Sequence, residues 1–164
     1  MPGSVPIVVR QARETDAPAA CDVLRRSIRE LCVADHENDE EILSAWLGNK
    51  TPENVRTWIA SSANFSVVAV RGDQVCGFGL LRDDGEIVLC YVLPEAQFTG
   101  SGRLMLRTLE ARAASWGLSR VVLTSTRTAK SFYERNGYHQ AGPAVPVVEL
   151  HGGEAFPMLK LIAV

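Results

Sequence analysis

The stretch from Gly85 to Arg103, GEIVLCYVLPEAQFTGSGR, constrains the fold more than any other part of the chain. An apolar run of strand length ends at Pro94, and a glycine-rich turn then leads into a helical pattern. Glu86 opens the strand, and the unhindered backbone of Gly100 and Gly102 opens the helix. Because free N–H groups at a helix N-terminus favour phosphate, the stretch predicts a carboxylate near a site for a phosphorylated ligand. A plain strand-to-helix junction is the alternative.

Apolar periodicity divides the chain into a helical first part and a strand-rich second part. The expected segments are strand 7–10, helix 17–33, a polar loop over 34–40, helices near 42–47 and 51–59, strands 65–71, 74–82 and 86–93, helix 100–116, strand 120–125, a short helix ended by Gly137, and strands 138–141 and 155–162 joined by a connector over 142–154. Gly72-Asp73 favours a hairpin turn of type II′. This order predicts an α+β (mixed α/β) fold in one domain, residues 1–164, with a central, mostly antiparallel twisted sheet of about seven strands flanked by helices.

Charge and cysteine content narrow the range of partners. The net charge is −2 and no run of Lys or Arg occurs, so we expect no nucleic-acid binding. No apolar stretch approaches the roughly 20 residues of a membrane span, and the first residues lack a signal-peptide pattern, so we expect no membrane contact. The four cysteines form no CxxC pair and have no histidine at metal-ligand spacing. We therefore expect reduced thiols, no metal and a cytoplasmic location.

The segment Gln97–Gly102 differs from the two best-known phosphate-binding loops. No Gly-Lys-Ser/Thr sequence follows it, so it is not a P-loop. Met105 stands where a dinucleotide-binding fingerprint has its third glycine. A nucleotide-binding protein is therefore disfavoured, although Arg103 would add a charge-assisted contact to a phosphate.

A second motif, SFYERNGY over residues 131–138, follows downstream. Together with Gln97-x-x-Gly100-x-Gly102 after a strand, it resembles the GCN5-related N-acetyltransferase (GNAT) superfamily, and the order of elements is similar to that fold. The resemblance covers nearly the whole chain and is strongest over residues 85–140. It implies a GNAT-like acyl-CoA N-acyltransferase fold and acetyl-CoA as co-substrate.

The resemblance also implies a cofactor site made mainly of backbone groups. The family's splayed fourth strand falls on residues 86–93, where a bulge would free backbone groups of Cys90, Tyr91 and Val92 for the pantetheine arm and the acetyl carbonyl. The N–H of Cys90 would then act as an oxyanion donor. The family's pyrophosphate loop, with the residue that begins the following helix, falls on Gln97, Phe98, Thr99, Gly100, Ser101, Gly102 and Arg103.

Two side chains are candidates for proton transfer. The run EIVLC beginning at Glu86 is similar to the strand that carries the catalytic glutamate in the histone-acetyltransferase branch. An amine must lose a proton before it attacks, and a carboxylate can accept that proton directly or through a water. Tyr133 matches the family tyrosine that protonates the departing CoA thiolate, a role that suits a phenol at neutral pH. A solvated strand-end glutamate and a core aromatic beside Phe132 are the alternatives.

The resemblance therefore predicts an N-acetyltransferase in which a primary amine attacks acetyl-CoA directly within a ternary complex. A non-catalytic acyl-CoA-binding or regulatory module on the same fold is the alternative. Thr126 stands where many members have an asparagine, so an amide contact to CoA is lost there, although the hydroxyl can cap a helix. Homodimers are common in the resembled family.

The acceptor side of this fold is usually covered by the segment after the first helix and by the last interstrand loop. Asp35 and its acidic neighbours would give an acidic mouth for a cationic amine, with a solvated loop as the alternative. His36 and His151 are further candidate bases, with a surface position and no role as the alternative for each. Trp46 would line the acceptor pocket, or pack in the core as its helical spacing with aliphatic residues also allows.

Overall fold

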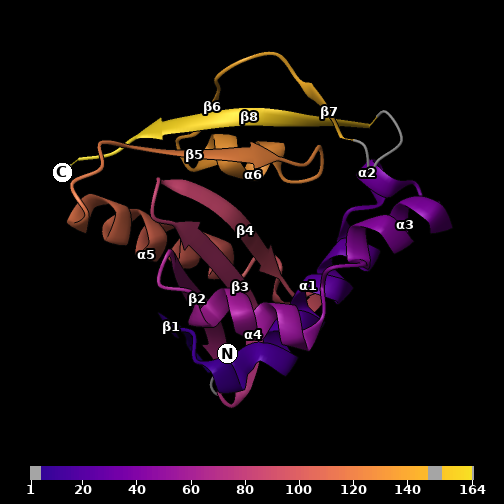
Figure 1. Cartoon of the computed structure of the whole chain (residues 1–164), viewed down its shortest axis with the longest axis horizontal. Helices are drawn as coiled ribbons and strands as arrows, with labels where there is room; N and C mark the ends of the chain where they lie inside the picture. The colour runs from indigo at the N-terminus through magenta and orange to yellow at the C-terminus, as the bar shows by residue number, and fades with distance from the viewer. Residues whose placement is uncertain (1–4, 148–152, 164) are drawn as a thin grey trace.

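One sheet of eight strands organises the part of the chain that the computed structural model describes, residues 5–147 and 153–163 (Figure 1). Its order is β1-β2-β3-β4-β5-β8-β6, with β7 also paired to β8. Every pair is antiparallel except β4 and β5, so the predicted mixed fold with a mostly antiparallel sheet is confirmed. The strands are β1 (Ile7–Gln11), β2 (Asn64–Arg71), β3 (Gln74–Arg82), β4 (Glu86–Val92), β5 (Arg120–Ser125), β6 (His139–Gln140), β7 (Val145–Val147) and β8 (Gly153–Leu161).

Helices cover both faces of the first half of this sheet. α1 and α5 lie on opposite faces of β3, and α4 packs against α1. Thr51 accepts a hydrogen bond from the N–H of Asn54 and so caps α4, as its position before Pro52 suggests. The helices are α1 (Ala17–Leu31), α2 (Val33–His36), α3 (Glu40–Leu47), α4 (Pro52–Ala60), α5 (Ser101–Ser115) and α6 (Lys130–Arg135), with 3-10 turns η1 (Glu14–Asp16) and η2 (Pro94–Ala96).

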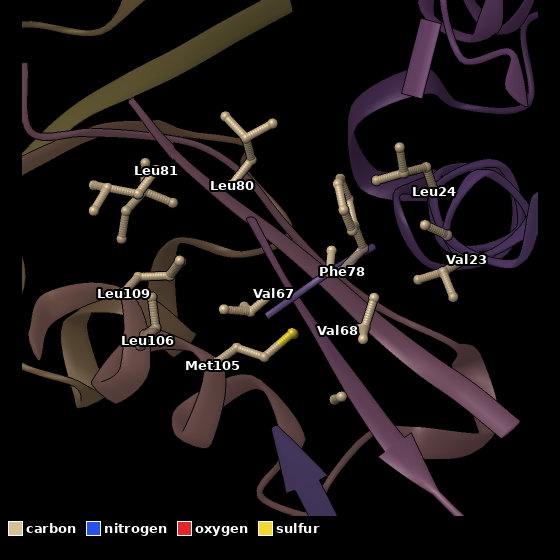
Figure 2. Packing of buried hydrophobic residues seen from close by; sticks show 14 of the residues in the cluster. Val23, Leu24, Val67, Val68, Phe78, Leu80, Leu81, Met105, Leu106 and Leu109 are labelled. Carbon is tan, nitrogen blue, oxygen red and sulfur yellow. The ribbon is translucent and has the colours of Figure 1, made fainter. Parts of the chain in front are cut away.

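The core is divided by β3, whose side chains alternate between the two helical layers (Figure 2). Phe78 points towards α1, where it meets Leu24. On the other face Gly77 leaves room for α5, since a Cβ there would lie 2.9 Å from the Met105 side chain. Each large apolar side chain buried in these layers contributes roughly 1.5–3 kcal/mol relative to an exposed one.

A β-bulge and a short seam separate β4 from β5. Leu80 pairs with Leu89, but Leu81 pairs with Ile87, so Val88 is the extra residue of a bulge in β4. The sequence placed this bulge near Cys90, which is wrong by two residues. β4 and β5 pair only through Glu86 and Ile87, and beyond this seam the two strands diverge. We call the region between Val88–Val92 and the end of β5, where the two strands are not paired, the gap.

Several element boundaries differ from the sequence prediction. The helix expected over 17–33 ends at Leu31, and the loop expected over 34–40 contains α2, because the carbonyl of Cys32 accepts the N–H groups of Asp35 and His36 and starts a new turn. Within the connector expected over 142–154, residues 145–147 form β7, which accounts for the eighth strand, and β8 already begins at Gly153. The II′-type turn is confirmed, since Gly72 has a φ of 60° and Asp73 is not among the residues with positive φ.

Candidate active site

Strand β4 turns two backbone N–H groups towards the gap. Residues of antiparallel neighbours alternate between pairs that exchange hydrogen bonds and pairs that do not. Leu93 donates to the carbonyl of Cys76 at 2.8 Å, in register with the β3–β4 ladder. By this alternation the N–H of Tyr91, two residues before Leu93, is bonded to β3. The N–H groups of Cys90 and Val92 face the other way, into the gap. This geometry fits the oxyanion role predicted for Cys90, and it removes the Tyr91 amide from the predicted ligand set.

The side chains of Cys90 and Tyr91 lie on opposite faces of β4. Cys90 is opposite Gly79, on the face covered by α5, whereas Tyr91 packs against a small apolar cluster of α1 and α3. Burial raises the pKa of the Cys90 thiol to about 12 and also raises the pKa of the Tyr91 phenol. Both groups are therefore protonated at neutral pH, and Cys90 is not a thiolate nucleophile.

Tyr133 reaches the gap from α6. Its ring packs edge-on against Phe132 and Tyr138, with centroid separations of 5.3 and 5.7 Å. Burial raises the pKa of its phenol well above the ordinary value, and the nearby Cys90 and Tyr91 add to the shift. Every fully buried side-chain nitrogen or oxygen in the described ranges has a hydrogen-bond partner, whereas the Tyr133 oxygen has none there, so this oxygen borders open space. Tyr133 and Cys90 thus lie near each other in the structure.

The loop before α5 presents a group of free backbone N–H donors. Phe98 and Gly100 have left-handed φ values of 61° and 87°, a backbone geometry found in anion-binding concavities. The Thr99 hydroxyl bonds the carbonyl of Ala96 at 2.5 Å and the Ser101 hydroxyl at 2.6 Å, so these side chains brace the loop. The N–H groups that meet no acceptor among the described residues belong to Phe98, Thr99, Gly100, Gly102 and Arg103. Such donors at a helix N-terminus fit a pyrophosphate.

Two further residues of this loop have distinct positions. A Cβ on Gly102 would lie 2.9 Å from the Phe132 ring, so the glycine allows α5 and α6 to meet beside the donors. Gln97 donates its own N–H to the carbonyl of Pro94 at 3.3 Å, and its backbone is therefore not one of the free donors.

Glu86 lies at the closed end of the gap, in the seam between β4 and β5. Its carboxylate forms an ion pair with Arg82 at 3.0 Å, and its side chain is 30 % exposed. Arg82 also binds Asp84 at 2.6 Å. Because the neighbouring Ile87 is buried on the α5 side, Glu86 points to the other face of β4, the face on which Tyr91 lies.

Thr126 caps the turn before α6, as the sequence predicted. Its hydroxyl oxygen accepts a hydrogen bond from the N–H of Ala129 at 3.1 Å. This bond fixes the hydroxyl within the protein and anchors the chain where it leaves β5.

The acidic mouth expected around Asp35 does not form at that residue. Asp35 is buried, and its carboxylate accepts hydrogen bonds from the N–H groups of Arg127 and Thr128 at 2.7 and 3.0 Å and from the Thr128 hydroxyl at 2.5 Å. Asp39 caps α3 by accepting the N–H groups of two residues of its first turn. These two carboxylates hold the backbone and are not available to a cationic amine.

His36, expected as a candidate base or as a surface residue with no role, does not lie at the surface. It is fully buried, with Nε2 2.9 Å from the carbonyl of Ile28 and Nδ1 3.0 Å from the N–H of Asn38. Since Nδ1 must accept, the proton lies on Nε2 and both nitrogens are occupied. His151 lies outside the described residues. Trp46 is partly exposed, with its ring 6.2 Å from that of His36, and it borders the same cluster as Tyr91.

A buried polar network behind the gap was missed from the sequence. Glu110 of α5 accepts the Tyr138 hydroxyl at 2.7 Å and the Lys160 ammonium at 3.0 Å. The signal was present, because Glu110 occupies an apolar position one turn after Leu106 on the buried stripe of the helix. A charge at such a position is expected to have a buried partner.

A sequence model of the Acetyltransferase (GNAT) domain matches residues 33–162, which include the seam, the loop and Tyr133. The chain belongs to the GNAT acetyltransferase family. The resemblance found in the sequence is therefore confirmed.

Individual relatives agree with this membership. The amino-acid acetyltransferase of Ralstonia nicotianae is 33 % identical over 104 residues, which are 60 % of this chain and 23 % of that protein. The GNAT chain therefore spans less than a quarter of that relative's length. A GCN5-related N-acetyltransferase of Rhodopseudomonas palustris superposes with a TM-score of 0.83 at 21 % identity, over 99 % of both chains. PaiA N-acetyltransferase of Thermoplasma acidophilum, solved in complex with coenzyme A, gives 0.82 at 21 % identity, over 95 % of this chain and 99 % of that one. At these identities the two structures show the shared fold.

None of the helices in the described ranges has the length and apolar character that a membrane crossing needs. Over the same residues, no group of three or more His, Cys, Asp or Glu side chains is arranged to hold a metal ion.

Proposed function

We propose that this GNAT chain transfers an acetyl group from acetyl-CoA to a primary amine. The observation that carries the proposal is the Tyr133 phenol, which lacks a partner among the described residues and lies near Cys90, whose N–H faces the same gap. Transfer from a thioester needs a donor for the carbonyl oxygen and a proton for the departing sulfur. The two groups would supply these from opposite sides of the gap.

Acetyl-CoA would supply the activated thioester, and the residues present fit its pyrophosphate and its pantetheine arm. The free N–H groups around Phe98–Arg103 would hold the pyrophosphate, helped by the exposed guanidinium of Arg103. Along the gap, the N–H groups of Cys90 and Val92 would bond the amide-containing arm in place of a neighbouring strand. Thr126 would contribute indirectly, by holding the turn before α6.

Glu86 is the base in this proposal and Tyr133 the acid. The amine nitrogen gives a proton to the Glu86 carboxylate, directly or through a water, and the Tyr133 oxygen gives its proton to the thiolate sulfur. Glu86 is supported by its place at the seam and by its direction towards the Tyr91 face. The thiol of Cys90, with a pKa raised by burial to about 12, is a poor nucleophile, which supports direct attack in a ternary complex over an acyl-cysteine route.

The acceptor would approach on the face of β4 that carries Glu86 and Tyr91. Trp46 and Tyr91 are the aromatic side chains we propose as its walls, since both border the cluster between α1 and α3. The Ralstonia nicotianae relative is named an amino-acid acetyltransferase. Amino acids are therefore the first acceptor class to test, before aminoglycosides, polyamines and peptide amines.

We also propose that residues 1–164 form one domain that works in the cytoplasm. All four cysteines are free thiols, three of them buried, which suits a reducing compartment. A homodimer would be detected by light scattering at micromolar concentrations.

Calorimetry with acetyl-CoA, followed by a thioester-consumption assay over the amine panel, tests the function. Binding together with turnover on at least one amine is the expected result. No binding at millimolar acetyl-CoA would remove the proposal. Tight binding with no turnover on any amine would favour the alternative of a non-catalytic acyl-CoA-binding module.

A further inference from the structure

Helix α2 lies where the two halves of the sheet separate. It follows α1, which covers β3 and β4, and it also contacts β8 in the second half. Figure 1 shows α2 near the start of β8, on the side away from its arrowhead. A helix of four residues has little stability of its own, so its position depends on its anchors.

The first anchor is Asp35, which joins α2 to the turn that follows β5. Its carboxylate accepts the N–H groups of Arg127 and Thr128 and the Thr128 hydroxyl, three bonds across more than 90 positions of sequence. Arg127 and Thr128 lie just before Ala129, the N-cap residue of α6, which is the helix that carries Tyr133. Asp35 therefore caps the chain at the point where β5 has left β4.

The second anchor is the next residue, His36, which joins α2 to α1. Its Nε2–H donates to the carbonyl of Ile28, and its Nδ1 accepts from Asn38. Ile28 belongs to the cluster that also contacts Tyr91 of β4. Consecutive residues of α2 thus bind opposite sides of the gap.

We propose that Asp35 is a positioning residue that holds the β5–α6 turn at the distance from β4 that acetyl-CoA needs. The inference rests on the proposed function, because it assigns the gap to that ligand. By linkage, a ligand that binds along the gap stabilises the latch formed by Asp35, Arg127 and Thr128, and the intact latch strengthens binding of the ligand by the same factor. α2 carries this coupling from the acceptor side of β4 to the helix of Tyr133.

Asp35→Asn tests the latch, because an asparagine keeps the shape but can accept at only one of its two terminal atoms. We expect the Kd for acetyl-CoA to rise about tenfold or more, the size of one lost charge-assisted bond. Thr128→Val removes only the hydroxyl donor and should raise the Kd by a smaller factor. In the wild type, acetyl-CoA should slow amide exchange in α2 and at residues 127 and 128, and this slowing should be absent in Asp35→Asn.

Asp16→Asn is the matched control for a general loss of stability. Asp16 is as buried as Asp35, at 9 % exposure, and it also accepts three hydrogen bonds, from the guanidinium of Arg10 and the N–H of Arg13. It belongs to η1, far from the gap along the sheet, so its variant should leave the Kd unchanged.

Three results are informative. A raised Kd in Asp35→Asn but not in Asp16→Asn supports the latch. Equal Kd values in wild type, Asp35→Asn and Thr128→Val, with ligand-induced protection of α2 retained, overturn it and leave the proposed function standing. Failure of the wild type to bind acetyl-CoA overturns the proposed function and the coupling together.

Discussion

Replacing each of two neighbouring tyrosines by phenylalanine separates catalysis from stability. Tyr133 and Tyr138 are both buried and pack against each other at 5.7 Å. The Tyr138 hydroxyl donates to Glu110 at 2.7 Å, whereas the Tyr133 hydroxyl has no partner among the described residues. The same one-atom deletion therefore removes a structural bond in one variant and the proposed proton donor in the other.

The expected magnitudes follow from these contacts. A hydrogen bond to a charged group contributes about 1.5–3 kcal/mol, so Tyr138→Phe should lower the free energy of unfolding by about 2 kcal/mol. For a chain of this size that is a fall in Tm of roughly 4–8 °C. Tyr133→Phe keeps the ring packing and should cost less than about 0.5 kcal/mol. A general acid contributes about 10²–10⁴ in rate, so its kcat should fall at least about 100-fold.

Urea unfolding gives the stabilities, calorimetry the Kd for acetyl-CoA, and steady-state assays the kcat at saturating acetyl-CoA with the best amine. Tyr138→Phe should retain most of its kcat despite the lower stability, and Tyr133→Phe should bind acetyl-CoA almost as well as the wild type. Full activity in Tyr133→Phe would refute its role as the acid. Equal destabilisation of both variants would refute the difference in bonding on which the comparison depends.

Four other outcomes are expected. Glu86→Gln should lower kcat/KM by about 10²-fold or more and flatten the acidic limb of its pH profile, and an unchanged profile would move the base elsewhere. Gly102→Ala places a Cβ 2.9 Å from Phe132, so it should lower the free energy of unfolding by about 1–3 kcal/mol and weaken acetyl-CoA binding. Gly142→Ala, with open space around its Cβ, should change neither quantity. Cys90→Ala should keep most of the kcat, and complete loss would argue for a covalent route. Burial raises the pKa of the Cys32 and Cys90 thiols to about 12. As the pH rises towards about 9 and above, the unfolded chain therefore loses thiol protons that the folded chain keeps. The free energy of unfolding, measured in urea, should be level from about pH 7 to 8 and fall from there to about pH 11.

Local patterns in the sequence predicted most of the elements near the site. The strands over 74–82 and 120–125 have the predicted bounds, because β-branched and apolar runs are closed on both sides by turn residues or charges. The loop Gln97–Gly102 and the helix after it were predicted for the same reason, since glycine and the helical stripe act locally. Cys90 and Tyr133 were paired only through the family resemblance, because their proximity depends on the whole sheet.

Long-range anchoring explains what the sequence did not predict. Asp35 and His36 were expected in a solvated loop, but partners far along the chain, at Thr128, or buried in α1, at Ile28, fold that segment into α2. The bulge was displaced from Cys90 to Val88 because its position depends on the register with β3, which no local pattern in β4 encodes. Glu86 was predicted as a carboxylate beside a buried strand, and its ion pair with Arg82 depends on the turn between β3 and β4.

The bulge at Val88 has a consequence for how such a chain can change over evolution. The extra residue shifts the hydrogen-bond ladder of β4 by one position. Every backbone amide after Val88 therefore faces the side opposite to the one it would face in a regular strand of the same sequence. Substitutions that flatten the bulge, with Val88 kept in a regular ladder, would turn Cys90 and Val92 towards β3 and offer the Tyr91 amide to β5 instead. Strands β4 and β5 would then be able to form a hydrogen-bonded pair along their length. A lineage could lose the proposed ligand site in this way while every element of its fold survives.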